Sequence, residues 1–126
     1  MNIAIILAGG TGNRMGQDIP KQFINVNDKP VLIYTLEGFE RHDGIDEICV
    51  VCIKGWESMV RAYANQFCIT KLKHIVEAGA SAQESIYNGV RHLRETCAED
   101  DTVIIHDGIR PLVDASVLTD VIEKAQ

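Results

Sequence analysis

The sequence predicts an α/β fold with a doubly wound, mainly parallel sheet and helices on both faces. Apolar, β-branched runs that suit buried strands alternate along the chain with segments of helical periodicity. Each passage leads from strand to helix in the same order, which favours right-handed crossovers and a Rossmann-like architecture. The 126 residues, 46% of them hydrophobic, are expected to form one domain, residues 1–126, with its own core.

Four segments have the composition of strands. Residues 3–8 are an apolar run that suits a strand buried on both faces. Residues 47–53 follow the turn signal Asp43-Gly44, and residues 73–77 are shorter and more polar. Residues 102–106 complete the set and form the fourth predicted strand.

Four further segments have the 3.6-residue periodicity of helices. They are residues 31–40, 56–67, 81–96 and 115–124, the last with Asp114 or Ser116 as its N-cap. The aromatic residues of the second helix are expected to belong to the core and not to a base-stacking surface. The expected core positions of the first two helices are Leu36, Phe39, Met59, Val60, Tyr63 and Phe67.

A glycine-rich stretch follows the first strand at once. It contains Gly9, Gly10, Gly12 and Gly16. These glycines permit positive φ angles, so that successive N–H groups can converge on an anion, and Arg14 and Lys21 add fixed positive charge beside them. This combination indicates a nucleotide triphosphate loop. The simpler interpretation is a flexible connection that carries two solvated cations.

Two common phosphate motifs do not fit this stretch. A dinucleotide fingerprint requires a third glycine, but Gly10-Thr11-Gly12 is followed by Asn-Arg-Met at positions 13–15. A P-loop requires Gly-Lys followed by Ser or Thr, and the sequence contains no such triplet.

A second loop of small residues precedes the third predicted helix. Ser81 and Glu84 have capping-box spacing, which marks the helix start, and Gly79-Ala80 lies just before it. Such a loop at a helix N-terminus can bind a ligand through backbone amides, although an ordinary capped turn is the simpler local interpretation.

Asp107 follows the fourth predicted strand. Because doubly wound sheets bind ligands at the carboxyl ends of their strands, Asp107 is a candidate ligand for Mg²⁺, a cation that takes carboxylate, phosphate and water oxygens. A turn-capping aspartate before Gly108 is the local alternative. His106 is expected to be a hydrogen-bonded structural residue.

Composition restricts the partners. A net charge of −6 argues against nucleic acid and acidic membranes. With neither a signal-peptide pattern nor a membrane-length apolar run, a cytoplasmic location is expected. Cys49 and Cys52 have an odd offset within a strand and should face opposite sides of the sheet, which argues against a shared metal site, and Cys68 and Cys97 are isolated in the sequence. All four are therefore expected to be buried or half-buried thiols.

Taken together, two segments resemble the cytidylyltransferases that activate polyol phosphates with CTP. They are Ala-Gly-Gly-Thr-Gly-Asn-Arg-Met-Gly at 8–16 and Pro-Lys-Gln-Phe at 20–23. The family includes 2-C-methyl-D-erythritol 4-phosphate cytidylyltransferase of isoprenoid synthesis and ribitol-5-phosphate cytidylyltransferase of surface-polymer synthesis. The segments at 77–89 and 106–111 match the same family in the same order, so the resemblance covers essentially the whole chain.

The resemblance implies a nucleotide-diphospho-sugar transferase type of fold and a role for each matching residue. Ala8, Gly9, Gly10 and Gly12 would bind the nucleotide, Arg14 and Lys21 would be catalytic, and Asp107 would bind nucleotide and Mg²⁺. Gly79 and Ala80 would meet cytosine, with Ser85 nearby. Arg110 would orient its loop.

The activity implied is transfer of CMP from CTP to D-ribitol 5-phosphate or 2-C-methyl-D-erythritol 4-phosphate, giving a CDP-polyol and pyrophosphate. Ala82 stands where isoprenoid-type members usually have arginine, and Gly108-Ile109 where they usually have two alanines. The alanine at position 82 favours the ribitol branch, as do the sequences of Gly9–Gly12 and residues 29–33.

Family members are considerably longer than 126 residues, so the chain is expected to be the N-terminal portion of a longer protein and its sheet to be incomplete at the C-terminus. The resemblance implies a homodimer for that longer protein. Two alternatives stay open: a sugar-1-phosphate nucleotidyltransferase, and a fragment that acts only as a nucleotide-binding module.

Overall fold

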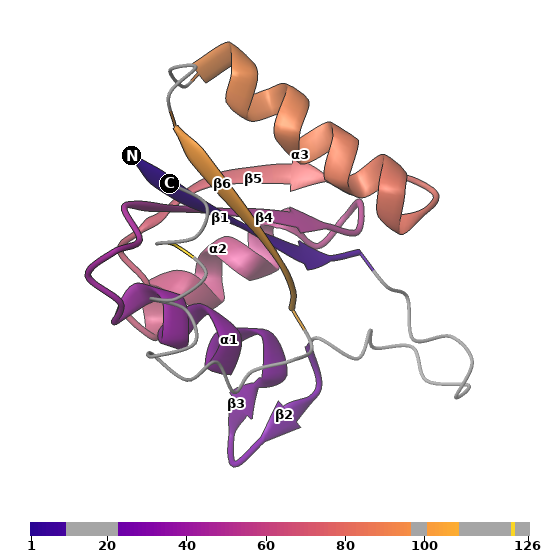
Figure 1. Ribbon diagram of the computed structural model, residues 1–126. Helices are drawn as coiled ribbons and strands as arrows, with labels where there is room; N and C mark the ends of the chain where they lie inside the picture. Colours follow the sequence, from indigo (N-terminus) through magenta and orange to yellow (C-terminus); the bar gives the residue numbers. More distant parts are fainter. Residues whose placement is uncertain (10–22, 97–100, 109–121, 123–126) are drawn as a thin grey trace.

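A computed structural model shows a four-stranded parallel sheet with helices on both faces (Figure 1). The structure describes residues 1–9, 23–96, 101–108 and 122. The strands of the sheet are β1 (Asn2–Ala8), β4 (Glu47–Cys52), β5 (Leu72–Glu77) and β6 (Thr102–Asp107), in the spatial order β5-β4-β1-β6. The predicted α/β class and parallel sheet are therefore confirmed.

Strand β1 lies at the centre of the sheet because it pairs with β4 on one side and with β6 on the other. Ile5, for example, pairs with Cys49 and with Ile105. The side chains of Ile3, Ile5 and Ile6 are completely buried, so β1 faces apolar cores on both sides of the sheet, as its composition predicts.

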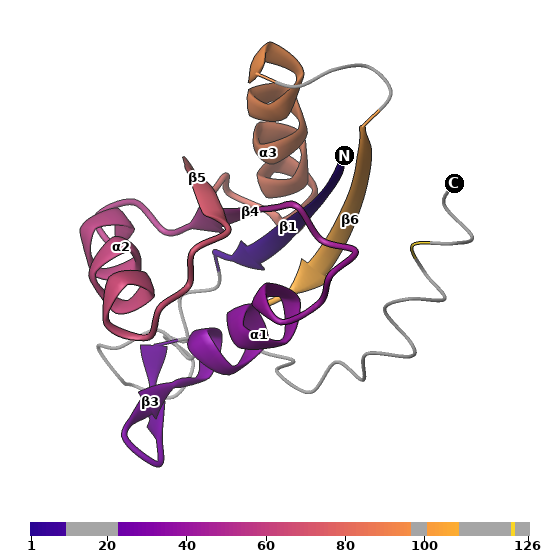
Figure 2. The same cartoon turned by 90° about the vertical axis from the view of Figure 1, so that its left-hand side faces the viewer.

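The helices divide between the two faces of the sheet (Figure 2). Helices α1 (Val31–Glu40) and α2 (Glu57–Gln66) cover one face, and α3 (Ala82–Thr96) covers the other. Each corresponds to a predicted helix. The predicted fourth helix, residues 115–124, lies outside the described residues apart from Ile122.

The predicted core positions of α1 and α2 are confirmed with one exception. Leu36, Phe39 and Val60 are buried, and Tyr63 and Phe67 pack at the core margin. Met59 is 42% exposed, so its assignment to the core was wrong. The stripe of α2 that faces the sheet contains Val60 and Ala64, one helical turn apart, and Met59 lies about 100° away from it around the helix.

A short hairpin between β1 and α1 was not predicted. Its strands are β2 (Asn25–Val26) and β3 (Lys29–Pro30), which pair antiparallel. Asn27 and Asp28 have φ angles of 54° and 64°, the conformation of a two-residue type I′ turn. The Asn-Asp pair was the available signal, but strands of two residues give no periodicity.

The cysteine predictions are partly confirmed. Cys49 and Cys52 are buried in the two cores on opposite faces of the sheet. Burial, followed by the charges of Glu57 and Glu77, raises the pKa of Cys52 to about 12, so this thiol is neutral at physiological pH. Cys68, however, is exposed at the end of α2, and Cys97 lies outside the described residues.

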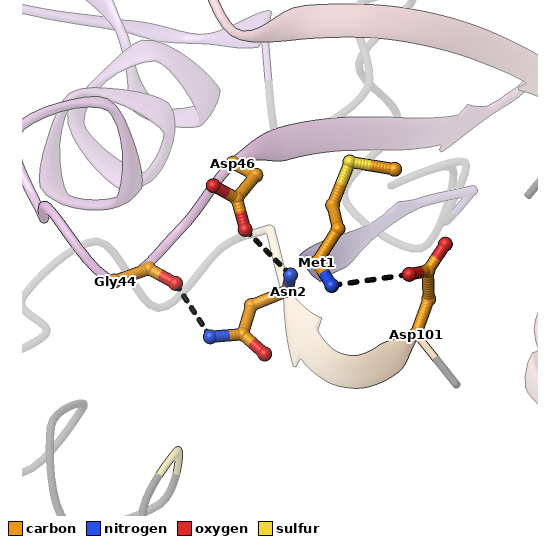
Figure 3. Close-up of polar contacts among 5 residues, drawn as sticks. All are labelled: Met1, Asn2, Gly44, Asp46 and Asp101. Atoms are coloured by element: carbon orange, nitrogen blue, oxygen red, sulfur yellow. Dashed lines mark hydrogen bonds and ion pairs between the residues drawn. The ribbon is translucent and has the colours of Figure 1, made fainter. Parts of the chain in front are cut away.

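The amino end of β1 is tied to both neighbouring connections (Figure 3). The Met1 ammonium lies 3.1 Å from the Asp101 carboxylate, just before β6. The Asn2 backbone N–H donates to Asp46, and its side-chain amide donates to the Gly44 carbonyl, just before β4. These bonds fix the register from the end of the sheet opposite the predicted site.

None of the described helices has the length and apolar character needed to cross a membrane.

Cys68 offers a test of backbone strain. It has a φ angle of +60°, a left-handed conformation that favours glycine at a helix end. We expect Cys68→Gly to raise the free energy of unfolding by about 0.5–1 kcal/mol, because glycine relieves the Cβ penalty. Cys68→Ala keeps a Cβ and is the matched control. Equal denaturation midpoints for the two variants would contradict this account.

Candidate functional site

The carboxyl ends of the parallel strands bring the predicted site residues to one edge of the sheet. Leu7 pairs with Asp107 on β6, and Ala8 pairs with Cys52 on β4, which in turn pairs with Glu77 on β5. The loops that leave β1, β5 and β6 therefore start at the same edge of the sheet. Doubly wound sheets bind their ligands at this edge.

Gly9 packs directly against the connection between β5 and α3. A Cβ atom at Gly9 would lie 2.8 Å from the Ala78 Cβ and 3.5 Å from the Ser85 Oγ. Only a residue without a side chain fits here unless the β5–α3 connection moves. The two loops that the sequence analysis assigns to the nucleotide thus meet at Gly9.

Buried Ser85 holds the Gly79 turn. Its side chain is 5% exposed, and its Oγ accepts a hydrogen bond of 3.0 Å from the Gly79 N–H. The serine is thus part of the structure of the loop as well as a neighbour of the predicted ligand. Gly79 itself lies under the Glu84 side chain, because a Cβ at Gly79 would be 2.3 Å from the Glu84 Cγ.

The predicted capping box at the start of α3 is confirmed in one half. The Ser81 Oγ accepts from the Glu84 N–H at 3.1 Å, as predicted. The Glu84 carboxylate accepts from the Ala80 N–H at 3.2 Å, whereas a capping box would direct it to the N–H of Ser81. Both backbone donors that the resemblance assigns to cytosine, those of Gly79 and Ala80, therefore already have side-chain partners.

An open depression of about 460 Å³ lies on the outer side of this connection, between β5 and α3. It is lined by Val76, Glu77, Ala78, Gly79, Glu84, Asn88, Arg91, His92 and Glu95. Three of these side chains are carboxylates and one is a guanidinium, which does not suit a triphosphate.

The end of β6 is held from two directions. The Gly108 N–H donates to the Leu7 carbonyl at 2.8 Å, and the Gly108 carbonyl accepts from the Thr35 Oγ1 at 2.9 Å. The Asp107 side chain just before it is exposed. His106 packs with its ring edge to Phe39, 5.3 Å between centroids, in accordance with a structural role.

The donor set at this edge fits a magnesium ion that is held mainly by a nucleotide. The described part of the chain contains no group of three or more histidine, cysteine, aspartate or glutamate side chains arranged to hold a metal. Mg²⁺ does not require such a group, since it is bound by one or two carboxylates together with phosphate oxygens and water. The exposed Asp107 carboxylate at the end of β6 meets that requirement.

The structure brings together six of the predicted site residues and does not describe the other four. Those at the carboxyl edge are Ala8, Gly9, Gly79, Ala80, Ser85 and Asp107. Those outside the described residues are Gly10, Gly12, Arg14 and Lys21, and the same holds for Arg110. Phe23, two residues after Lys21, is buried and stacks on Trp56 with ring centroids 4.4 Å apart.

Sequence reasoning missed Thr35. Its side chain is fully buried on α1 and reaches the segment that follows Asp107. The signal was present, because Thr35 occupies the i+3 position of the apolar stripe formed by Leu32, Leu36 and Phe39. A hydroxyl among core positions indicates a buried hydrogen bond, but the sequence does not identify the acceptor.

The parallel sheet, with its glycine-rich loop and terminal carboxylate at one edge, defines a Rossmann-like α/β domain, a class of fold that commonly binds its ligands at this edge. Comparison with known proteins makes the assignment specific. The model of the 2-C-methyl-D-erythritol 4-phosphate cytidylyltransferase family, IspD, matches residues 2–126. The chain belongs to this family.

Individual relatives and solved structures agree with this membership. The chain is 55% identical, over all of its 126 residues, to ribitol-5-phosphate cytidylyltransferase of Lacticaseibacillus paracasei, and covers 54% of that protein. It is 37% identical to 2-C-methyl-D-erythritol 4-phosphate cytidylyltransferase of Clostridium botulinum Loch Maree, over 93% of the chain and 50% of the relative. A crystal structure of 4-diphosphocytidyl-2C-methyl-D-erythritol synthase superposes with a TM-score of 0.78 at 30% identity, over 98% of the chain and 53% of that structure. The chain thus spans about half the length of these proteins.

The two serines of the β5–α3 connection allow a matched test. Ser81→Ala removes the N-cap of α3 and is expected to cost about 1 kcal/mol in the free energy of unfolding. Ser85→Ala leaves the Gly79 N–H without its partner and is expected to cost about 1–3 kcal/mol. Hydrogen exchange of the Gly79 amide should accelerate in the second variant alone. Unchanged exchange in Ser85→Ala would show that Ser85 does not hold the turn.

Proposed function

We propose that the intact protein is a cytidylyltransferase that transfers CMP from CTP to a polyol phosphate, giving a CDP-polyol and pyrophosphate. The observation that carries this proposal is the meeting of three loops at one sheet edge, where Gly9 abuts Ala78 and Ser85 and where Asp107 pairs with Leu7. Family membership over residues 2–126 supports it.

The reaction is an in-line displacement at the α-phosphorus of CTP. A phosphate oxygen of the polyol phosphate forms the new P–O bond, while the bond to the β-phosphate oxygen breaks and pyrophosphate leaves. The nucleophile is already anionic, so positioning and charge stabilisation contribute more than a protein base. In this proposal the backbone of Gly10 and Gly12 surrounds the triphosphate, and Arg14 and Lys21 stabilise the transferring and leaving phosphates.

The cytosine ring of CTP is proposed to lie at the β5–α3 connection. The Gly79 N–H is bonded to a buried hydroxyl, whereas the Ala80 N–H is bonded to the exposed carboxylate of Glu84. An exposed partner is more easily exchanged for a ligand than a buried one. We therefore assign the Ala80 amide to cytosine and the Ser85–Gly79 bond to keeping the turn in shape.

Mg²⁺ is proposed as the cofactor, held by Asp107 and by phosphate oxygens of CTP. A bound divalent cation would supply charge neutralisation for the pentavalent transition state and the leaving pyrophosphate. In this proposal the chain's own oxygen donor is the Asp107 carboxylate, which the pairing of Asp107 with Leu7 supports, because it brings the end of β6 next to the end of β1.

The acceptor proposed is D-ribitol 5-phosphate, with 2-C-methyl-D-erythritol 4-phosphate as the alternative. The greater identity to the Lacticaseibacillus relative supports the ribitol branch, as does Ala82 in place of arginine. The methylerythritol alternative, which would place the protein in isoprenoid synthesis, is supported by the likeness to the synthase structure. By the same family resemblance we propose a homodimer that works in the cytoplasm.

Removing the proposed catalytic lysine is the direct test of the chemistry. We expect Lys21→Ala to lower the turnover of the intact protein about a hundredfold or more, because one lost charge contact to the transition state costs on the order of 3 kcal/mol. Pyrophosphate release from CTP and ribitol 5-phosphate measures the effect, and the thermal midpoint should change little. Lys73→Ala, an exposed lysine on β5, is the control. Undiminished turnover in Lys21→Ala would refute its catalytic role.

Ligand selectivity separates this function from the other two classes. Calorimetric titration of the intact protein with CTP, UTP, ATP and NAD, with Mg²⁺ and then with EDTA, should show selective, Mg²⁺-dependent binding of CTP. A preference for UTP would favour a sugar-1-phosphate nucleotidyltransferase. CTP binding without pyrophosphate release from either polyol phosphate would favour a nucleotide-binding module.

A further inference from the structure

We propose that Thr35 is a positioning residue for Asp107, and that its hydroxyl keeps the end of β6 in the geometry needed for Mg²⁺-dependent nucleotide binding. This inference rests on the proposed role of Asp107. It concerns a contact between Thr35 on helix α1 and Gly108 after β6, two residues that are 73 positions apart in the chain.

The contact fixes the backbone immediately after the carboxylate. The Gly108 N–H is bonded to the Leu7 carbonyl at 2.8 Å, and the Gly108 carbonyl is bonded to the Thr35 Oγ1 at 2.9 Å. Both peptide groups that flank the Gly108 α-carbon are thereby held, one by the central strand and the other by a helix on one face. Asp107 is joined directly to this clamped residue.

The surroundings of Gly108 leave no room for a side chain. A Cβ atom here would lie 2.8 Å from the Leu7 carbonyl oxygen and 3.1 Å from the Leu32 Cδ1. Gly108 is therefore packed between β1 and α1, and its carbonyl is shielded from water. A buried carbonyl that loses its donor must either turn toward another donor or remain unpaired.

Threonine is an unexpected choice at this place on α1. Side chain 35 is completely buried, on a helix that contributes Leu32, Leu36 and Phe39 to the core, and valine would have nearly the same shape without a polar group to satisfy. Threonine in mid-helix commonly donates to a carbonyl of its own preceding turn. Here it donates to Gly108 across the α1–β6 interface, which indicates that the hydroxyl serves that interface.

The test compares Mg²⁺-supported CTP binding in variants of the intact protein. Calorimetry with Mg²⁺ varied at fixed CTP gives the apparent Mg²⁺ affinity. We expect Thr35→Val to weaken the apparent Mg²⁺ affinity about ten- to a hundredfold, the range typical of lost outer-shell partners. Thr35→Ser keeps the hydroxyl and should have the wild-type affinity. CTP binding in EDTA should be the same in all variants. Without ligand, the Gly108 amide should exchange faster in Thr35→Val.

A matched control separates positioning from general stability. Ile33→Val changes another completely buried side chain of α1 without touching a hydrogen bond, and it should retain the wild-type Mg²⁺ affinity. Wild-type Mg²⁺ affinity in Thr35→Val would overturn the inference. If Thr35→Val is too unstable to purify, Thr35→Ser decides the question alone. This variant keeps the hydroxyl donor, so a Mg²⁺ affinity as weak as that of Asp107→Asn would overturn the inference.

Asp107→Asn distinguishes failure of this inference from failure of the proposed function. If Asp107→Asn keeps the wild-type Mg²⁺ affinity, the metal role of Asp107 is wrong and the inference is overturned with it. If Asp107→Asn loses that affinity and Thr35→Val does not, the inference alone is overturned.

Discussion

The two-sided burial of β1 is the constraint on which the rest of the structure depends. A strand with apolar cores on both faces has to be paired along both edges, because its backbone groups have no access to water. Pairing with β4 and β6 meets this requirement, and the parallel direction of both neighbours follows from the crossovers. The same pairing places Gly9 beside the β5–α3 connection and Asp107 beside Leu7.

Buried polar side chains then fix the loops that the sheet brings together. Among the described residues the buried polar side chains are those of Asn2, Thr35 and Ser85. Asn2 fixes the amino end of β1, whereas Ser85 and Thr35 hold Gly79 and Gly108 at the opposite edge. A buried hydroxyl costs free energy unless it is bonded, so each bond is both necessary for stability and specific in direction.

Much of the fold was predictable from sequence because it depends on local periodicity. The buried runs and amphipathic helices gave strands and helices close to those observed, and Ser81 marked the start of α3. The hairpin at Asn27-Asp28 was missed because two-residue strands leave no pattern, and Met59 was misplaced because a methionine fits both core and surface. The site was predictable only in part. Sequence selected the glycines and Asp107 as candidates, and the structure brings Gly9, Gly79 and Asp107 to one edge of the sheet. The hydrogen-bond partner of Thr35 lies 73 residues away and that of Glu84 is one residue from the capping-box position, so neither follows from the local pattern.

The charge of the chain explains why the site needs several kinds of donor. With a net charge of −6, the 126-residue chain repels a polyanion, and the described edge itself carries Glu77, Glu84 and Asp107. Backbone N–H groups can attract phosphate without adding to that total, whereas Arg14 and Lys21, which are already counted in it, are proposed to supply positive charge next to the phosphates. Asp107 adds to the repulsion unless a divalent cation lies between it and the phosphates. If Asp107 holds the metal as proposed, this carboxylate makes nucleotide binding conditional on metal, and the direction that Thr35 is proposed to give it becomes part of the binding site.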